Sequence, residues 1–184
     1  MNSKTYRIVS SGLLIALSII LTRVFSANLI VAGIPAARLA AGFVPVMLAG
    51  LLLGPYYGLG VGALADIIGY MVFPSGAYFP PITLTSALVG LLPYLIVKWT
   101  PNWKEWQKTL AAVAVTQILC SMLLQTFWLS ILYGKAYELL LYPRIAVTLV
   151  TIPVYFIMIY TIFSALKRAN LLPARDARLA KSRK

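Results

Sequence analysis

The chain has 184 residues, of which 61% are hydrophobic and 11% are charged, and its mean hydropathy is +0.88. The charged side chains are too few to cover a soluble domain, and the apolar residues form long runs rather than the one-sided stripe of a surface helix. The net charge is +12, with no histidine, one cysteine and four carboxylates, which leaves most acid–base and metal chemistry without its usual residues. The composition predicts an integral membrane protein that is not an enzyme and holds no metal or cofactor.

Six apolar segments approach the length of about 20 residues that a spanning helix needs. The predicted helices are at about residues 6–26, 39–53, 57–73, 82–97, 109–132 and 144–166. The second is the least certain of the six, because an arginine and two prolines crowd its start. A basic tail covers 167–184. We therefore predict an all-α six-helix bundle, with residues 1–184 as a single membrane domain.

Lysines and arginines set the expected orientation. Placing the N-terminus and the C-terminus in the cytoplasm puts twelve of the sixteen basic residues on the inner side, and the opposite orientation puts four there. The net charge then reflects topology and attraction to anionic lipid. No basic groove with interleaved aromatic residues is present, so no nucleic-acid partner is expected. The protein is predicted to cross the plasma membrane several times.

Four basic residues remain on the predicted outer side, and only Glu138 is there to neutralise them. They are Arg23, Arg38, Lys135 and Arg144. Each one alone could extend towards lipid headgroups or mark a helix end. Four cations that converge on one level with one carboxylate fit better with an anionic ligand bound from outside.

Small residues recur four positions apart on the first three helices, a spacing that lets helix backbones approach closely in lipid. The pairs are Gly12 with Ala16, Gly50 with Gly54, Gly58 with Gly62, and Ala65 with Gly69. In the second and third helices, packing inside the bundle is the preferred interpretation. Gly12 and Ala16 on the first helix could equally form the docking surface of a partner protein in the membrane.

The connection after the third helix, residues 73–81, contains three prolines and a glycine, so it is not expected to be regular helix. Its aromatic residues are Phe73, Tyr78 and Phe79. They could form an ordered lid over a cavity, or an aromatic belt at the membrane interface, which is the commoner role of each one taken singly.

Polar residues line single faces of the last two predicted helices. On the fifth helix they are Gln117, Ser121, Gln125 and Trp128, and on the sixth Arg144, Thr148 and Thr151. The fourth helix adds Thr83 near its outer end. Asp66 in the third helix is harder to explain by packing, because a carboxylate near the bilayer centre costs about 2.5–3.5 kcal/mol. A ligand contact and an ion pair with Arg23 or Arg144 both remain open for it.

Two blocks of sequence resemble the folate-specific substrate-binding subunit, or S component, of bacterial energy-coupling factor (ECF) transporters. The first runs from Gly54-Pro-Tyr-Tyr-Gly through Ala65-Asp-Ile-Ile-Gly-Tyr to Phe73-Pro-Ser-Gly-Ala-Tyr-Phe-Pro, and the second from Phe127 to Lys135 and on to Tyr142-Pro-Arg144. The resemblance extends over nearly the whole chain.

The resemblance implies a six-helix protein of the bacterial plasma membrane that captures a vitamin at its outer face. Partners implied are a transmembrane coupling protein and two cytoplasmic ATPases, which use the ATP. This chain has no glycine-rich phosphate loop of its own. The family usually carries Ala-xxx-Ala on its first helix for docking to the coupling protein, and here Gly12-xxx-Ala16 stands in its place.

Folate matches the polar and aromatic residues described above. Its two tail carboxylates could be neutralised by Arg23, Arg38, Lys135 or Arg144. The flat pterin ring needs aromatic faces, for which the candidates are Tyr78, Phe79, Trp128 and Tyr133. Its amino-pyrimidine edge offers donors that Asp66 or Gln125 could accept. The alternatives are another flat heterocycle, such as a queuosine precursor or riboflavin, and a stand-alone secondary carrier.

Overall fold

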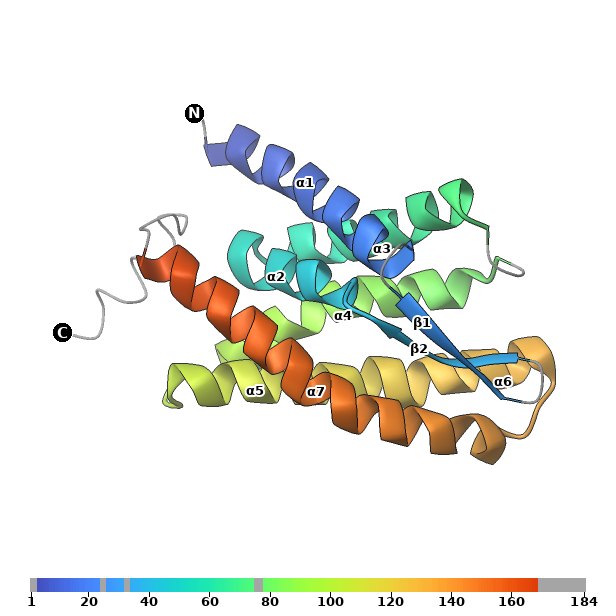
Figure 1. The fold of residues 1–184 in the computed structure, drawn as a ribbon. Coiled ribbons are helices and arrows are strands. Elements are labelled where there is room, and N and C mark those ends of the chain that lie inside the picture. The colour runs from blue at the N-terminus through green and yellow to red at the C-terminus, as the bar shows by residue number, and fades with distance from the viewer. Residues whose placement is uncertain (1–2, 24–25, 32–33, 75–77, 169–184) are drawn as a thin grey trace.

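A computed structural model describes the backbone of residues 3–23, 26–31, 34–74 and 78–168, and the side chains of 4–22, 41–74, 78–166 and 168. Its helices are α1 (Ser3–Arg23), α2 (Phe43–Leu53), α3 (Pro55–Val72), α4 (Pro80–Trp99), α5 (Glu105–Thr116), α6 (Gln125–Tyr133) and α7 (Tyr137–Arg168), with a π-helix η1 (Gln117–Leu124) between α5 and α6. Because α5, η1 and α6 form one continuous rod, the described residues make six helical rods packed side by side (Figure 1).

Four of these rods are long and apolar enough to cross a membrane, as judged by length and composition. They are the stretches Lys4–Thr22, Pro80–Trp99, Glu105–Tyr133 and Tyr137–Leu166. The apolar helix α2 is shorter. A helical protein that crosses the membrane several times, as the sequence predicted, is thereby confirmed.

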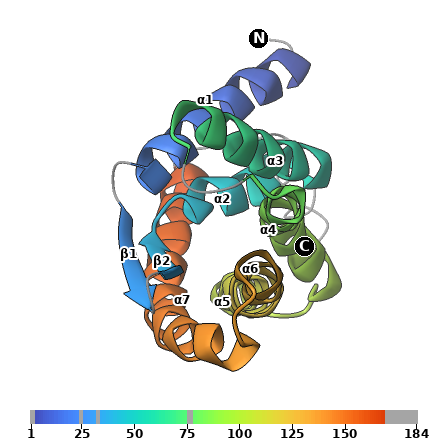
Figure 2. The same ribbon diagram turned by 90° about the vertical axis from the view of Figure 1, so that its right-hand side faces the viewer.

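The prediction of helices alone is wrong for the segment after α1. Residues expected to finish the first helix, form a loop and begin the second instead make an antiparallel hairpin, β1 (Ser26–Val31) with β2 (Ile34–Ala40). A bulge follows Leu29, where the register shifts. The hairpin packs beside α7 and closes the side of the bundle between α1 and α7 (Figure 2). Its strands pair with each other, so many of their backbone N–H and C=O groups are hydrogen-bonded without a helix.

Helix ends also differ from the prediction. The second helix begins four residues later than predicted, at Phe43, because the hairpin takes the residues before it. The fourth begins at Pro80, where proline occupies the first turn and loses no hydrogen bond. The fifth begins at Glu105, four residues earlier than predicted, and the side chain of Gln107 caps its first turn. The last begins at Tyr137, so the arginine expected at its start lies about two turns inside it.

Successive rods run in opposite directions along the bundle (Figure 1). The start of α1, the end of α7 and the α4–α5 connection therefore lie at one end. The hairpin, the α3–α4 connection and the α6–α7 connection lie towards the other end, which we call the ligand end. Of the predicted basic tail, 169–184 lies outside the described residues.

Helix α2 lies at the centre of the packing, with residues 44–50 all buried and Met47 wholly inaccessible. Glycines allow three backbones to meet there. A Cβ on Gly50 would overlap the carbonyl oxygen of Gly90, and one on Gly90 would overlap the carbonyl oxygen of Gly58. A Cβ on Gly62 would overlap the carbonyl of Ser86. We call this contact of α2, α3 and α4 the glycine seam. It confirms internal packing as the role of Gly50, Gly58 and Gly62, whereas a Cβ built on Gly54 meets nothing within 4 Å.

Candidate ligand site at the η1–α6–α7 face

Arg144 is the centre of the candidate site. Its side chain is only 7% exposed, and its Nη1 donates to the carbonyl oxygen of Ser121 at 2.7 Å and to Oε1 of Gln125 at 3.3 Å. Its Nε is buried and has no hydrogen-bond partner. Within the described side chains no carboxylate lies at ion-pair distance from it. A buried guanidinium that is bonded only to neutral groups is stabilised by an added anion.

The π-helix explains how a backbone carbonyl reaches Arg144. In an α-helix the carbonyl of Ser121 would accept from the amide of Gln125, but that amide donates instead to Cys120, five residues back. The Ser121 oxygen is thereby available to the guanidinium. One turn deeper, Nε2 of Gln117 donates to Thr151 at 3.2 Å. These two contacts bring together the polar faces predicted for the fifth and sixth helices.

Aromatic rings flank the same face. The ring of Trp128, one turn beyond Gln125 on α6, lies 5.1 Å from Phe127 and 6.2 Å from Phe79, both edge to face. The Trp128 indole N–H is buried and has no partner. Viewed from the ligand end, α6 lies between α4, which Phe79 caps, and α7, which carries Arg144 (Figure 2). The site thus combines ring surfaces, a free indole donor and a cation.

A second polar cluster joins α3 to α4. The hydroxyl of Thr83 donates to the carboxylate of Asp66 at 2.7 Å and lies 3.1 Å from the hydroxyl of Tyr78. The Tyr78 ring lies 5.1 Å from that of Tyr70. Tyr78 directly precedes Phe79, whose ring lies 6.2 Å from that of Trp128, so the backbone links this cluster to α6. The sequence left open a ligand contact or an ion pair for Asp66. Within the described side chains, no ion pair links Asp66 to Arg144.

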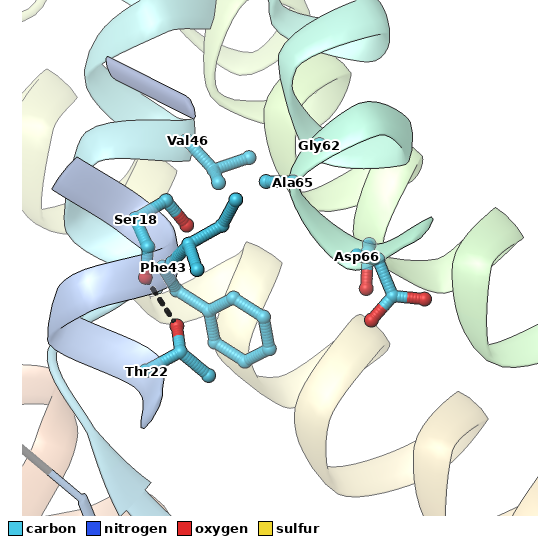
Figure 3. A pocket seen from close by; sticks show the side chains of 9 residues that line it. Ser18, Thr22, Phe43, Val46, Gly62, Ala65 and Asp66 are labelled. Carbon is cyan, nitrogen blue, oxygen red and sulfur yellow. Dashed lines mark hydrogen bonds between the residues drawn. The ribbon is translucent and has the colours of Figure 1, made fainter. Parts of the chain in front are cut away.

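A small cavity between α1, α2 and α3 also reaches Asp66. Its volume is about 40 Å³, and Figure 3 shows Ser18 and Thr22 on its α1 wall, Asp66 on its α3 wall and Phe43 between them. Such a volume holds water, whereas pockets for drug-sized ligands measure about 300–1,000 Å³.

The remaining predicted site residues lie apart from this face or outside the described side chains. Tyr133 packs against Leu129 and Leu140 in a small apolar cluster. Lys135 is exposed in the α6–α7 connection, where its carbonyl accepts from Ser130 at 2.7 Å. Arg23 ends α1 and Arg38 pairs with Asn28 in the hairpin, but the side chains of both arginines are outside the described set.

The predicted docking pair is exposed on α1. Ala16 and Gly12 both lie on the surface, and a Cβ built on Gly12 meets no atom within 4 Å. Apolar neighbours on α1 are exposed as well, among them Leu13 at 70%. This face is therefore free for lipid or for another membrane helix.

Two contributors to the site were not predicted from the sequence. Phe127 was seen only as part of a motif, although it directly precedes Trp128. The ring of Tyr70 is tilted against that of Tyr78, and Tyr70 lies one helical turn after Asp66, a spacing that places both on one face of α3. That spacing is the signal that could have identified it.

Comparison with known proteins places the chain in a family. Residues 6–163 match the family described as "ECF transporter, substrate-specific component". The chain is 34% identical over 159 residues to the folate transporter FolT of Clostridium novyi, covering 86% of this chain and 88% of the relative. It is 24% identical over 155 residues to the folate transporter FolT of Leuconostoc mesenteroides, covering 82% and 80%.

Solved structures give the same result. A crystal structure of FolT bound with folic acid matches with a TM-score of 0.70 and 27% identity, over 83% of this chain and 89% of that one. The S component of a bacterial ECF transporter matches with a TM-score of 0.68 over 90% and 97%, and its 20% identity supports the fold alone. This chain therefore belongs to the family of substrate-specific components of ECF transporters.

Proposed function

We propose that this protein is the folate-binding component of an ECF-type importer of the bacterial plasma membrane. The observation that carries the proposal is its similarity, over most of both chains, to proteins named as folate transporters, one of them solved with folic acid bound. The family is one of transport components and not of enzymes. In this proposal the chain binds the vitamin and partner subunits use the ATP.

Arg144 supplies the charge that such a ligand requires. A folate tail carries two carboxylates, and a guanidinium forms its strongest hydrogen bonds with a carboxylate, using two parallel N–H groups. Nη1 is already held by Ser121 and Gln125, so the guanidinium is fixed before the ligand arrives. Nε, which has no partner, is free to donate. An incoming carboxylate therefore meets an oriented cation.

The ring end of the ligand fits the aromatic and acidic groups. Trp128 and Phe79 offer faces for a flat heterocycle. Asp66 is an acceptor for the amino-pyrimidine edge, and Thr83 already orients its carboxylate. We propose that the pterin lies between the Asp66 cluster and Trp128 and that the tail extends towards Arg144. Arg23, Arg38 and Lys135 would meet the tail at the mouth of the site.

The orientation proposed from the sequence is compatible with this arrangement. Both described chain ends lie at the end opposite the site, so termini in the cytoplasm place the site at the outer face (Figure 1). Six crossings then result from the six rods, with α2 buried among the others. The exposed face of α1 at Gly12 and Ala16 would dock the coupling protein, which acts with two cytoplasmic ATPases.

Folate binding to the purified protein tests the proposal. Titration of the detergent-solubilised chain with folate should give saturable binding at one site per chain, with quenching of Trp128 emission. Riboflavin and a queuosine precursor serve as competitors and should not displace folate at equal concentration. A monodisperse, thermally cooperative sample that binds no folate would remove the proposed function, and uptake by the chain alone in liposomes would favour a stand-alone carrier.

A further inference from the structure

The α4–α5 connection combines exposed tryptophans with exposed lysines. Three of the four tryptophans of the chain lie within eight residues of one another, and they are 77%, 50% and 45% exposed at Trp99, Trp103 and Trp106. Lys98 and Lys104 are exposed between and beside them. We propose that this connection is a binding surface for the headgroups of anionic phospholipids.

The position of the tryptophans points to a lipid interface. They lie where one candidate span, ending at Trp99, gives way to the next, beginning at Glu105. Indole rings favour the headgroup level of a bilayer, because the ring is apolar and the N–H finds polar partners there. Full exposure of three such rings to water would be unfavourable. The membrane surface is the environment that suits all three.

The connection is also held in a fixed shape. The amide of Thr100 donates to the carbonyl of Ile96 at 3.1 Å, and Nζ of Lys108 donates to the carbonyl of Pro101 at 2.8 Å. The backbone amide of Lys104 donates to Oε1 of Gln107 at 3.0 Å, which caps α5. An ordered turn of this kind presents its lysines and indoles together rather than as a loose tail.

Charge selects anionic over neutral lipid. Lys98 and Lys104 lie at the end of the bundle where α1 starts and α7 ends, and that end also has Lys4, Arg7 and Arg168 on described helices. At the ligand end, the α6–α7 connection contributes one lysine, Lys135, and no tryptophan. Lysines near a bilayer surface are attracted by anionic headgroups, and this attraction is screened by salt.

Lipid quenching of tryptophan fluorescence tests the proposal. The Trp128→Phe variant leaves only the three connection tryptophans as fluorophores. It is reconstituted in phosphatidylcholine vesicles that contain brominated phosphatidylglycerol or, in parallel, brominated phosphatidylcholine at the same mole fraction. We expect stronger quenching by the brominated phosphatidylglycerol. The preference should weaken by about fivefold for each lysine removed in Lys98→Gln and Lys104→Gln, and should disappear in about 0.5 M NaCl, where the Debye length is only about 4 Å.

Lys135→Gln is the matched control, because it removes the same charge at the ligand end and should leave the preference unchanged. Equal quenching by the two lipids, or a preference that survives both lysine substitutions and high salt, would overturn the proposal. No quenching by either lipid would also overturn it, because the indoles would then not reach the lipid. The result is independent of folate binding, which is not part of the readout.

Discussion

Two halves of the bundle differ in whether their buried groups are fully packed and hydrogen-bonded. Around the glycine seam, α2, α3 and α4 meet backbone to backbone, and a single added methyl group at Gly90 would overlap a carbonyl oxygen. Along η1, α6 and α7 polar contacts accompany the apolar packing, and buried atoms of Gln117, Trp128 and Arg144 have no partner. Close packing at the seam stabilises the fold, whereas the second half contains buried hydrogen-bond donors and acceptors without partners. We therefore propose that the ligand binds in the second half.

The largest effect is expected at the seam. Gly90→Ala places a Cβ against the carbonyl of Gly58, so we expect a loss of about 3 kcal/mol or more and a fall in Tm of about 10 °C. Gly60→Ala is the control, because Gly60 lies on α3 beside Gly58 and a Cβ there meets nothing within 4 Å. Thermal unfolding of both variants in detergent provides the measurement. Equal Tm values for the two variants would show that the seam does not limit stability.

Arg144 should show the reverse behaviour. Arg144→Met keeps most of the side-chain volume but removes the cation, so folate affinity should fall about 100-fold, the scale of losing a buried charge contact. Without ligand, the Tm should stay the same or rise, because a buried charge without an opposite partner is no longer present. Isothermal titration and thermal unfolding measure both. A lower Tm with unchanged affinity would make Arg144 a structural residue.

Asp66 tests whether the division between halves is complete, since it lies on a helix of the seam but near the ligand end. Asp66→Asn keeps an oxygen for the Thr83 hydroxyl and loses the negative charge. Folate affinity should fall about tenfold, as expected for a lost hydrogen bond to a charged group. Thr83→Ser, which keeps the hydroxyl, should bind nearly as the parent does. If Asp66→Asn binds folate fully, the ring edge is recognised elsewhere.

The smallest effect on binding is expected on α1. Ala16→Trp adds bulk to an exposed face outside both halves, so folate affinity should change less than about twofold, the usual scale for surface substitutions. Uptake in cells that contain the partner subunits should nevertheless be lost, because the bulky ring blocks close helix approach. Ala146→Trp, an identical change on the exposed side of α7, is the control and should leave uptake intact. Normal uptake by Ala16→Trp would show that α1 is not the docking surface.

The polar faces of the second half, along η1, α6 and α7, could be predicted from the sequence. Gln117, Gln125 and Trp128 recur at helical spacing, and the same is true of Arg144 and Thr151 on the next helix. Because a polar stripe in lipid must meet another polar group, their contact followed from the pattern. The π-helix could not be predicted from the pattern, since spacings of four residues are equally compatible with an α-helix. Its widened turn depends on where Arg144 meets Ser121, which is a tertiary contact.

The sequence of residues 26–40 does not distinguish a β-hairpin from a loop. The β-branched residues Ile30 and Val31 precede Gly33, a strand-and-turn signal, but Pro35 and the basic Arg38 indicated a loop entering a helix. The strands pair only with each other and are supported by α7, so their stability comes from packing that no local pattern encodes. Termination of α6 at Gly134, by contrast, follows from its left-handed φ of 62°.

The measurement that tests the central claim most directly is a comparison of two ligands on two proteins. Folate and its tail diamide, which lacks both tail carboxylates, are titrated against the parent protein and Arg144→Met. If the buried guanidinium binds a tail carboxylate, the parent should prefer folate to the diamide by at least about tenfold, and the variant should bind the two alike. An equal loss of affinity for both ligands on removing Arg144 would contradict the account.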